Sequence, residues 1–228
     1  MRAIVIGHDH VAGLGLLGPA LERRDIRPEW TTVVPADRYD DPDVDLVLPD
    51  PAGADLVVTL GAPWPRERIE GWAAREVAFL RTAHDAGVPV LAICFGAQLL
   101  AEALGGGRTA LPAARVGWHP VVPSDGRVPA GPWFCWNAEQ LVAPPGAELL
   151  ATSAAGHEAF AAGRSVGVQF HPEMTVPLLE RWFTTGVPAG LDARALRAAT
   201  AAQDPRRLAA RAERVLALAL RPPGSAPG

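Results

Sequence analysis

Residues 88–106 read VPVLAICFGAQLLAEALGG, and this stretch decides the fold. It begins as a short, β-branched apolar run, which is typical of a buried parallel strand. It ends as a Leu/Ala/Glu helix that two glycines terminate. Cys94 stands between the two, with small residues two positions before and two positions after it. The pattern predicts a tight strand-to-helix turn that holds one reactive side chain above the edge of a sheet.

The predicted turn accounts for the residues on either side of Cys94. Ala92 and Gly96 are small because the strand and helix backbones nearly touch there. Backbone amides and the dipole at a helix N-terminus favour a thiolate. The N–H of Phe95 would point at an oxyanion on a carbonyl that Cys94 attacks. A buried structural cysteine is the alternative, since free cysteines often behave as small hydrophobic residues, and this stretch alone leaves both open.

Strands and helices alternate along the first hundred residues. Such alternation predicts an α/β protein with a doubly wound, mostly parallel sheet, whose functional loops lie at the carboxyl ends of the strands. The Asp- and Pro-rich residues 37–54 are expected to form a loop. We expect strands at residues 3–7, 29–34 and 55–60 and helices at residues 16–24 and 67–86.

After residue 107 the pattern changes to short strands separated by Pro and Gly turns. These strands are expected to form a small antiparallel region at the edge of the sheet, at residues 114–122, 132–136, 147–153 and 158–161.

Residues 164–173 read RSVGVQFHPE, which predicts a strand that ends in His171-Pro172-Glu173. In extended backbone, residues two apart face the same side, so His171 and Glu173 are expected to point the same way. A carboxylate beside an imidazole holds its tautomer and stabilises the imidazolium. With a cysteine at the predicted turn, this pair is favoured as a base and the group that orients it.

Composition excludes several classes of function. The chain has 228 residues and a net charge of −4 with interspersed charges, which gives no nucleic-acid footprint. No apolar run approaches the ~20 residues of a membrane span. All 21 basic residues are arginine, which excludes a P-loop lysine and a Schiff-base lysine. We therefore expect neither nucleic acid nor membrane as a partner.

The cysteines and histidines indicate no metal site. Only Cys94 and Cys135 occur, without a CxxC motif, so neither a disulfide scaffold nor a zinc site is predicted, and a cytoplasmic location is expected. Residues 8–10, His-Asp-His, have no further ligand cluster, and we expect them to form a solvated loop.

Two motifs together resemble those of a known family. Residues 89–100, PVLAICFGAQLL, are followed by GVQFHPE at residues 167–173, which places His171 77 residues after Cys94. This pair is similar to the motifs of class I, triad-type glutamine amidotransferases, above all the stand-alone relatives of the GMP synthase glutaminase domain. The resemblance implies Cys94 as nucleophile, His171 as general base and acid, and Glu173 as the residue that orients His171.

The resemblance also implies a reaction and its binding residues. The side-chain amide of glutamine would form a γ-glutamyl thioester and release ammonia, and water would then release glutamate, without a cofactor. The oxyanion would bind the N–H groups of Ala62 and Phe95. Gly61 would lie in the oxyanion loop and Gln98 beside the substrate. The implied fold is a three-layer, flavodoxin-like sheet with C-terminal helices.

Four positions depart from the family pattern. Ala92 replaces a usual glycine, Ala97 a frequent histidine, and Asn137 a histidine that follows a tryptophan. Ala62 replaces the second glycine of the oxyanion loop, where a β-carbon is tolerable only if φ stays negative. These departures lie in loops expected to surround glutamine and the acceptor, so they concern the substrate more than the triad.

The chain is expected to have three parts. Residues 1–185 form the amidotransferase domain, residues 186–220 form a helical extension packed on it, and residues 221–228 form a disordered tail. The extension is expected to contain two amphipathic helices with a break around Asp204-Pro205. Because no second catalytic domain fits in the remaining sequence, the ammonia-accepting synthetase and any ATP site are expected on a separate chain.

Two other functions stay open. One is a γ-glutamyl hydrolase or peptidase that acts on a γ-glutamyl conjugate, with the loop widened at Ala97 and Asn137. The other is a non-catalytic regulatory relative, which the presence of Cys94, His171 and Glu173 disfavours.

Overall fold

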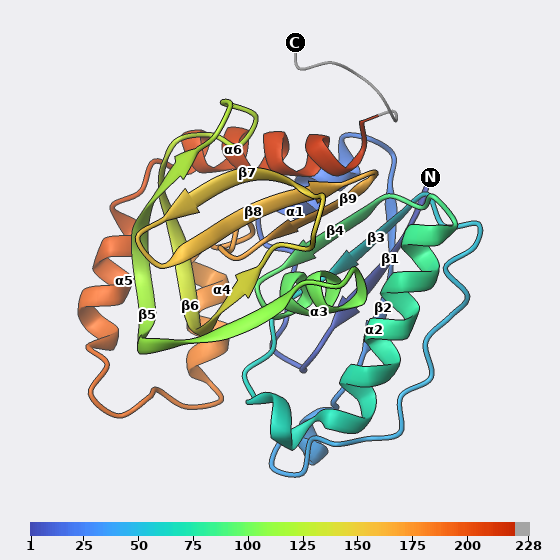
Figure 1. Ribbon diagram of the computed structural model, residues 1–228. Helices are drawn as coiled ribbons and strands as arrows, with labels where there is room; N and C mark the ends of the chain where they lie inside the picture. Colours follow the sequence, from blue (N-terminus) through green and yellow to red (C-terminus); the bar gives the residue numbers. More distant parts are fainter. Residues whose placement is uncertain (222–228) are drawn as a thin grey trace.

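The computed structural model describes residues 1–221, in which nine strands form a single sheet (Figure 1). The strand order is β2-β1-β3-β4-β9-β8-β7-β5-β6. The strands are β1 Arg2–Gly7, β2 Arg27–Thr32, β3 Leu56–Thr59, β4 Val90–Ile93, β5 Gly107–Pro123, β6 Gly131–Val142, β7 Glu148–Ser153, β8 Gly156–Ala162 and β9 Ser165–Val168. The helices are α1 Leu17–Glu22, α2 Glu70–Asp85, α3 Phe95–Ala103, α4 Val176–Phe183, α5 Ala193–Ala201 and α6 Pro205–Ala219, with 3₁₀ turns at Ala36–Arg38 and Arg66–Arg68.

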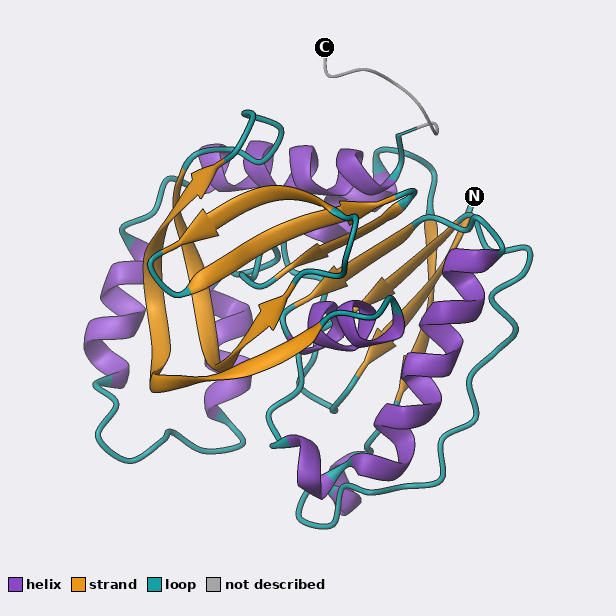
Figure 2. Ribbon diagram, viewed as in Figure 1, coloured by secondary structure: helices purple, strands orange, loops and turns teal. Residues whose placement is uncertain are grey.

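The sheet combines a parallel part and an antiparallel part. Strands β2, β1, β3, β4 and β9 pair with one another in parallel, whereas β9-β8, β8-β7, β7-β5 and β5-β6 are antiparallel pairs. Helices cover both faces of the parallel part (Figure 2). The predicted α/β fold, with its doubly wound, mostly parallel sheet, antiparallel edge region and C-terminal helices, is confirmed.

Alternation along β1 assigns its side chains to two separate core layers. Ala3 and Val5 belong to the cluster that contains α1 and α6, while Ile4 and Ile6 belong to the cluster that contains α2 and α3. Since a parallel strand is buried on both faces, its sequence is apolar throughout rather than alternating. The result is three layers, with α1 and α6 on one side of the sheet and α2 and α3 on the other.

Register brings three strand ends to one edge of the sheet. Thr59 of β3 is level with Ala92 of β4, and Ile93 is level with Val168 of β9. The loops that follow β3, β4 and β9 therefore leave the sheet side by side, which is where a doubly wound fold places its ligands.

The long β5–β6 pair leans over this edge. β5 pairs with β6 along most of its length and with β7 only at Val122 and Pro123. A carbonyl of β6, that of Phe134, accepts a hydrogen bond of 2.8 Å from the N–H of His171. Helices α4 and α5 cover the pair through a third apolar cluster, formed by Phe134, Met174, Leu178, Leu179 and Leu196.

Several predicted elements have other bounds in the structure, among them a helix and a strand near the sheet edge. The helix expected from residue 67 begins at Glu70, after a 3₁₀ turn. The strand expected to reach Glu173 ends at Val168, and Pro172 and Glu173 lie in a turn. Pro172 has no N–H to give a strand ladder, and the N–H of His171 bonds to Phe134 instead of continuing that ladder. The extended-backbone argument for His171 and Glu173 was therefore wrong about the backbone.

The C-terminal helices begin at capped positions. Asp192 accepts from the N–H of Ala195 at the start of α5, and Asp204 accepts from the N–H of Arg206 at the start of α6. Val215 of α6 belongs to the same core cluster as β1. The division at residue 185 stays a prediction, and the predicted disordered tail lies outside the described residues except for Arg221.

No helix within residues 1–221 is long and apolar enough to cross a membrane. The same residues bring together no group of three His, Cys, Asp or Glu side chains that could hold a metal ion.

The contact between β3 and α3 gives a test of the fold. A Cβ at Gly96 would lie 2.7 Å from Thr59 Oγ1 and 2.8 Å from the Thr59 carbonyl oxygen, so Gly96→Ala forces two backbones apart. We expect a loss of about 2 kcal/mol in the free energy of unfolding, measured in urea. Gly107→Ala is the control, because a Cβ there meets nothing within 4 Å. Equal stability of the two variants would contradict the close approach.

Candidate active site

Cys94 occupies a strained turn between β4 and α3. Its φ of 52° and ψ of −111° lie in a region that non-glycine residues rarely adopt. Two backbone bonds hold the turn, from Cys94 N to the Val168 oxygen at 2.8 Å and from Gly96 N to the Leu60 oxygen at 3.0 Å. Within residues 1–221 the one other non-glycine residue with positive φ is Asp25. The turn predicted from the sequence is present, with Cys94 directly before the first residue of α3.

His171 and Glu173 form a buried pair beside this turn. His171 Nδ1 lies 2.7 Å from Glu173 Oε1, and both side chains are almost fully buried. The carbonyl of Glu173 accepts from the N–H of Leu16 at 3.0 Å, which fixes the backbone of the turn. The imidazole also packs edge-on against Trp182, with ring centroids 5.0 Å apart. The ring is thus held by a carboxylate on one side and an aromatic face on another.

Gly61 brings Cys94 and His171 together. A Cβ built on Gly61 would lie 3.0 Å from His171 Cε1 and 3.9 Å from Cys94 Sγ. The thiol contacts the carbonyl of Trp136 at 3.8 Å, and Gln169 Nε2 donates to the sulfur at 3.6 Å. His171 Nε2 is buried and has no hydrogen-bond partner among the described residues. This nitrogen is the atom that can take a proton from the thiol.

The electrostatics of His171 favour its protonated form. Burial by itself lowers the pKa of His171, but the carboxylate of Glu173 and the neighbouring Cys94 outweigh it and raise the pKa to about 10. An imidazolium next to a cysteine favours the thiolate, which is the nucleophilic form of the sulfur. The arrangement can therefore support covalent attack by Cys94 on an electrophilic carbon.

A cavity of about 750 Å³ opens onto these residues. It is lined by Gly61, Ala62, Phe95 and Gln98, which the sequence predicts for the oxyanion and the substrate. The φ of Ala62 is not positive, so the backbone there tolerates the β-carbon that replaces the second glycine of the oxyanion loop. Aromatic and acidic side chains also line the cavity, among them Asp9, Tyr39, Trp64, Glu67, Trp136, Glu139 and Trp182.

The structure modifies two expectations about the cavity wall. Ala97 is fully buried in the core and does not line the cavity, so it cannot widen the loop. Asn137 does line it, and its Nδ2 donates to the Glu139 carbonyl at 2.8 Å. Gln98 Nε2 donates to the same carbonyl at 2.9 Å. Two amides of the wall thus converge on one backbone oxygen.

The expectation of a solvated loop at residues 8–10 was wrong for the first two. His8 is fully buried and Asp9 nearly so. His8 stacks on Trp72 of α2, with ring centroids 5.2 Å apart, and its Nε2 lies 2.8 Å from Glu76 Oε2. The sequence carried a signal for this contact, because Glu76 stands four residues from both Trp72 and Leu80, within the stripe that α2 buries.

Sequence reasoning also missed Gln169. Its Oε1 accepts from the N–H of Leu141 at 2.8 Å and from Gln98 at 3.3 Å, while its Nε2 reaches Cys94 Sγ. Gln169 stands two residues before His171, within the GVQFHPE motif of residues 167–173. Its side chain points into the sheet edge and contacts the sulfur of Cys94.

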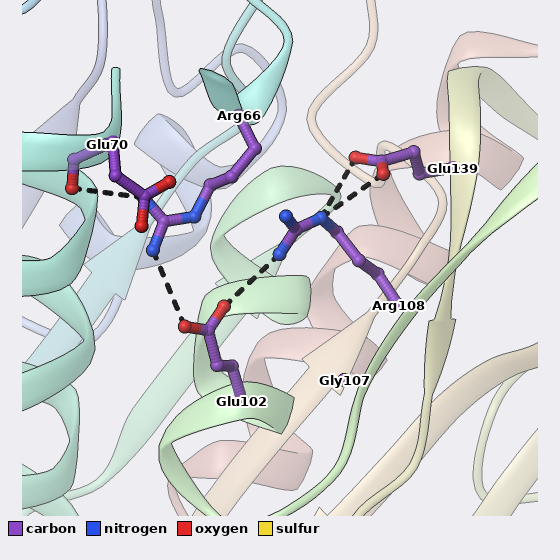
Figure 3. A pocket seen from close by; sticks show the side chains of 6 residues that line it. All are labelled: Arg66, Glu70, Glu102, Gly107, Arg108 and Glu139. Atoms are coloured by element: carbon purple, nitrogen blue, oxygen red, sulfur yellow. Dashed lines mark hydrogen bonds and ion pairs between the residues drawn. The ribbon is translucent and has the colours of Figure 1, made fainter. Parts of the chain in front are cut away.

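A smaller hollow of about 370 Å³ shares Glu139 with the cavity (Figure 3). Here arginines alternate with carboxylates: Arg66 lies 3.4 Å from both Glu70 and Glu102, and Arg108 lies 3.2 Å from Glu102 and 3.1 Å from Glu139. Each of these charges has a partner within the described chain, so the cluster is an ion-pair network at the surface rather than a second site.

Comparison with known proteins identifies the family. The model of the family described as "Glutamine amidotransferase class-I" matches residues 30–180, more than half of the chain. The chain belongs to the class-I glutamine amidotransferases. As expected for this family, its fold is a three-layer, flavodoxin-like sheet.

Curated relatives of this amidotransferase include GMP synthases described as glutamine-hydrolysing. That of Thermomicrobium roseum is 42% identical over 100 residues, which cover 40% of this chain and 19% of the relative. That of Marinobacter nauticus is 31% identical over 137 residues, which cover 52% of this chain and 25% of the relative. The chain thus spans about a fifth to a quarter of the length of these relatives.

Solved structures share the fold across nearly the whole chain. A glutamine amidotransferase from Thermotoga maritima superposes with a TM-score of 0.79 at 21% identity, covering 97% of this chain and 99% of its own. A glutamine amidotransferase from Methylobacillus flagellatus gives a TM-score of 0.77 at 23% identity, covering 96% and 94%.

The two cysteines are expected to differ in reactivity. Burial raises the pKa of Cys135 to about 12, whereas Cys94 lines the cavity beside an imidazolium. Iodoacetamide at pH 8 should add one carbamidomethyl group per chain, detected by intact mass. Cys94→Ala should add none, and the control Cys135→Ala should still add one. Labelling that survives in Cys94→Ala would contradict this assignment.

The raised pKa of His171 predicts the pH dependence of stability. The folded state holds this proton more tightly than an unfolded chain, in which the pKa is 6.5. The stabilisation is fully present below pH 6.5 and is lost as the pH rises through about 10. The difference in free energy of unfolding between the wild type and Glu173→Gln should therefore shrink from pH 7 to pH 10. A difference that is constant over this range would count against the buried ion pair.

Proposed function

We propose that this class-I amidotransferase hydrolyses glutamine through a γ-glutamyl thioester on Cys94 and supplies the ammonia to a separate synthetase. The observation that carries the proposal is the placement of Cys94, on its strained turn, next to the buried pair of His171 and Glu173 at the foot of one cavity. A nucleophile, a base and a group that orients the base are the three components of triad chemistry.

The first half of the reaction starts from a thiolate at Cys94, with the proton of the thiol held on His171 Nε2, and the sulfur attacks the side-chain amide carbon of glutamine. The C–S bond forms as the carbonyl π electrons move onto the oxygen. The N–H groups of Ala62 and Phe95 bind this oxyanion. When the oxyanion collapses, the C–N bond breaks, and the nitrogen takes the proton from His171 and leaves as ammonia. The enzyme is left as a thioester with a neutral imidazole.

In the second half, water replaces the amine. His171 Nε2 removes a proton from the water as its oxygen attacks the thioester carbon, and the C–S bond breaks when the second tetrahedral intermediate collapses. Glutamate leaves, and the thiolate and imidazolium are restored. Glu173 orients His171 and stabilises the imidazolium in each half.

The proposal places ammonia use on another chain. The relatives are described as glutamine-hydrolysing GMP synthases, which supports glutamine hydrolysis that is coupled to the use of its ammonia. The sequence has no lysine, so it contains no Walker A motif for ATP. We therefore assign ATP binding and the ammonia acceptor to the partner synthetase.

One observation favours a second candidate, the hydrolysis of a γ-glutamyl conjugate. The cavity falls within the range of about 300–1,000 Å³ that is typical of sites for drug-sized ligands, and glutamine is smaller than these. Trp64, Trp136 and Trp182 provide apolar wall beyond the catalytic residues. The same thioester would form, with a larger amine as the leaving group.

The triad assignment predicts a graded loss of activity. Cys94→Ala should abolish glutamate release, because no thioester can form. His171→Ala should lower kcat by about 10²–10⁴-fold, the usual contribution of a general acid and base. Glu173→Gln should lose less, because it impairs orientation and not proton transfer itself. Glutamate release from glutamine measures all three, and Cys135→Ala serves as the control that keeps wild-type activity.

Two outcomes would revise the proposal. Turnover retained in Cys94→Ala would contradict the thioester. A kcat/KM that is higher for a γ-glutamyl anilide than for glutamine would favour the conjugate hydrolase. The glutamine analogue 6-diazo-5-oxo-norleucine should add once to the wild type and not to Cys94→Ala, which ties either reaction to the same sulfur.

A further inference from the structure

A buried chain of polar side chains runs beneath the oxyanion loop. His8 Nδ1 lies 2.9 Å from the carbonyl oxygen of Gly61, and His8 Nε2 lies 2.8 Å from Glu76 Oε2. Thr59 Oγ1 donates to Glu76 Oε1 at 2.5 Å. The residues His8, Glu76 and Thr59 are all fully buried. The proposed mechanism uses none of them. Burying two titratable groups costs free energy unless both are fully paired, so the presence of this pair needs a reason.

Chemistry fixes the direction of these bonds. A carbonyl oxygen can only accept, so His8 Nδ1 carries a hydrogen and donates it to Gly61. The hydroxyl of Thr59 donates to Glu76, which accepts through Oε1. The bond between His8 Nε2 and Glu76 Oε2 needs one further proton. When His8 is an imidazolium and Glu76 a carboxylate, Nε2 donates this proton and Oε2 accepts it. Burial lowers the pKa of His8, but Glu76 outweighs it, and the net shift is upward.

We propose that His8, held by Glu76 and Thr59, is a positioning residue that sets the orientation of the oxyanion-binding N–H of Ala62. The inference rests on the proposed function, because it concerns the oxyanion of that reaction. In this role the buried His8–Glu76 pair supports the loop that contains Gly61 and Ala62, in addition to packing in the core.

The planarity of the peptide bond transmits the effect. A trans peptide holds its carbonyl and the following N–H antiparallel in one plane, and no peptide bond within residues 1–221 is cis. The bond from His8 to the Gly61 oxygen therefore turns the N–H of Ala62 away from His8. The side of Gly61 on which a side chain would stand faces His171 and Cys94. Without a donor at His8, the peptide between Gly61 and Ala62 could rotate, and the N–H of Ala62 would then point away from the site.

His8 also contacts the residue that supplies the second donor. Its ring packs edge-on against Phe95, with centroids 5.3 Å apart and planes at 88°. Phe95 is the first residue of α3, so its N–H has no partner within the helix. One side chain thus contacts both halves of the proposed oxyanion site, by a hydrogen bond to Gly61 and by packing on Phe95.

Two amide substitutions separate the bonds of His8. In His8→Asn the side-chain nitrogen is attached to Cγ, as Nδ1 is in histidine, so it can donate to Gly61. In His8→Gln the nitrogen lies one bond further out, near the position of Nε2, so it can meet Glu76 but not Gly61. Glu76→Gln is the conservative variant, because its amide can accept from Thr59 and donate to a neutral His8.

We expect kcat for glutamate release to fall about 10²-fold in His8→Gln, the usual effect of losing one oxyanion donor, with KM unchanged. His8→Asn and Glu76→Gln should stay close to the wild type. The rate at which iodoacetamide alkylates Cys94 should be equal in all four proteins, because that displacement forms no oxyanion. A role confined to folding would instead lower both rates together.

Crystal structures of the two His8 variants give a readout that does not depend on activity. The peptide between Gly61 and Ala62 should keep its orientation in His8→Asn and turn in His8→Gln, or in His8→Phe if His8→Gln does not fold. Equal kcat in His8→Asn and His8→Gln, or an unchanged peptide in the variant without the donor, would overturn the positioning role. A wild type that releases no glutamate would overturn the proposed function instead, and the peptide orientation would then decide the role of His8 alone.

Discussion

The whole site depends on the backbone of Cys94, which is held at a φ of 52°. Such a conformation costs of order 1–3 kcal/mol and persists only when its surroundings leave no alternative. Here the surroundings are the ends of β3 and β9, whose backbones bond to Gly96 and Cys94 on either side of the turn. The parallel sheet thus holds the turn in this conformation, and the turn places the sulfur of Cys94 above the strand ends.

The same strand ends set the distances between the other groups. Gly61 follows β3, His171 follows β9, and both reach the sulfur because the register places their strands on either side of β4. A β-carbon at Gly61 would press on the imidazole, so this position must remain small for the pair to meet. The geometry of the proposed active site is therefore a property of the sheet more than of any single loop.

Sequence reasoning succeeded where the signal is local. The apolar run and glycines around Cys94 indicated the turn, and the spacing of Leu and Ala indicated the C-terminal helices. It failed where a partner is distant. His8 and Glu76 are 68 residues apart, and nothing near His8 shows that α2 will bring a carboxylate to it. Gln169 was overlooked for a related reason, because its partners Gln98 of α3 and Leu141 of β6 are also distant in the sequence.

The packing of α6 has a consequence for the order of synthesis. Ala3 and Val5 of β1 leave the ribosome long before α6 does, yet they share a core cluster with Val215, Leu216 and Ala219. The part of this face of the sheet that α1 does not cover stays exposed until α6 has been made. Exposed apolar strands in a nascent chain promote association with other chains. Translation of this protein thus leaves an interval in which a chaperone has an apolar surface to bind, and the docking of α6 ends it.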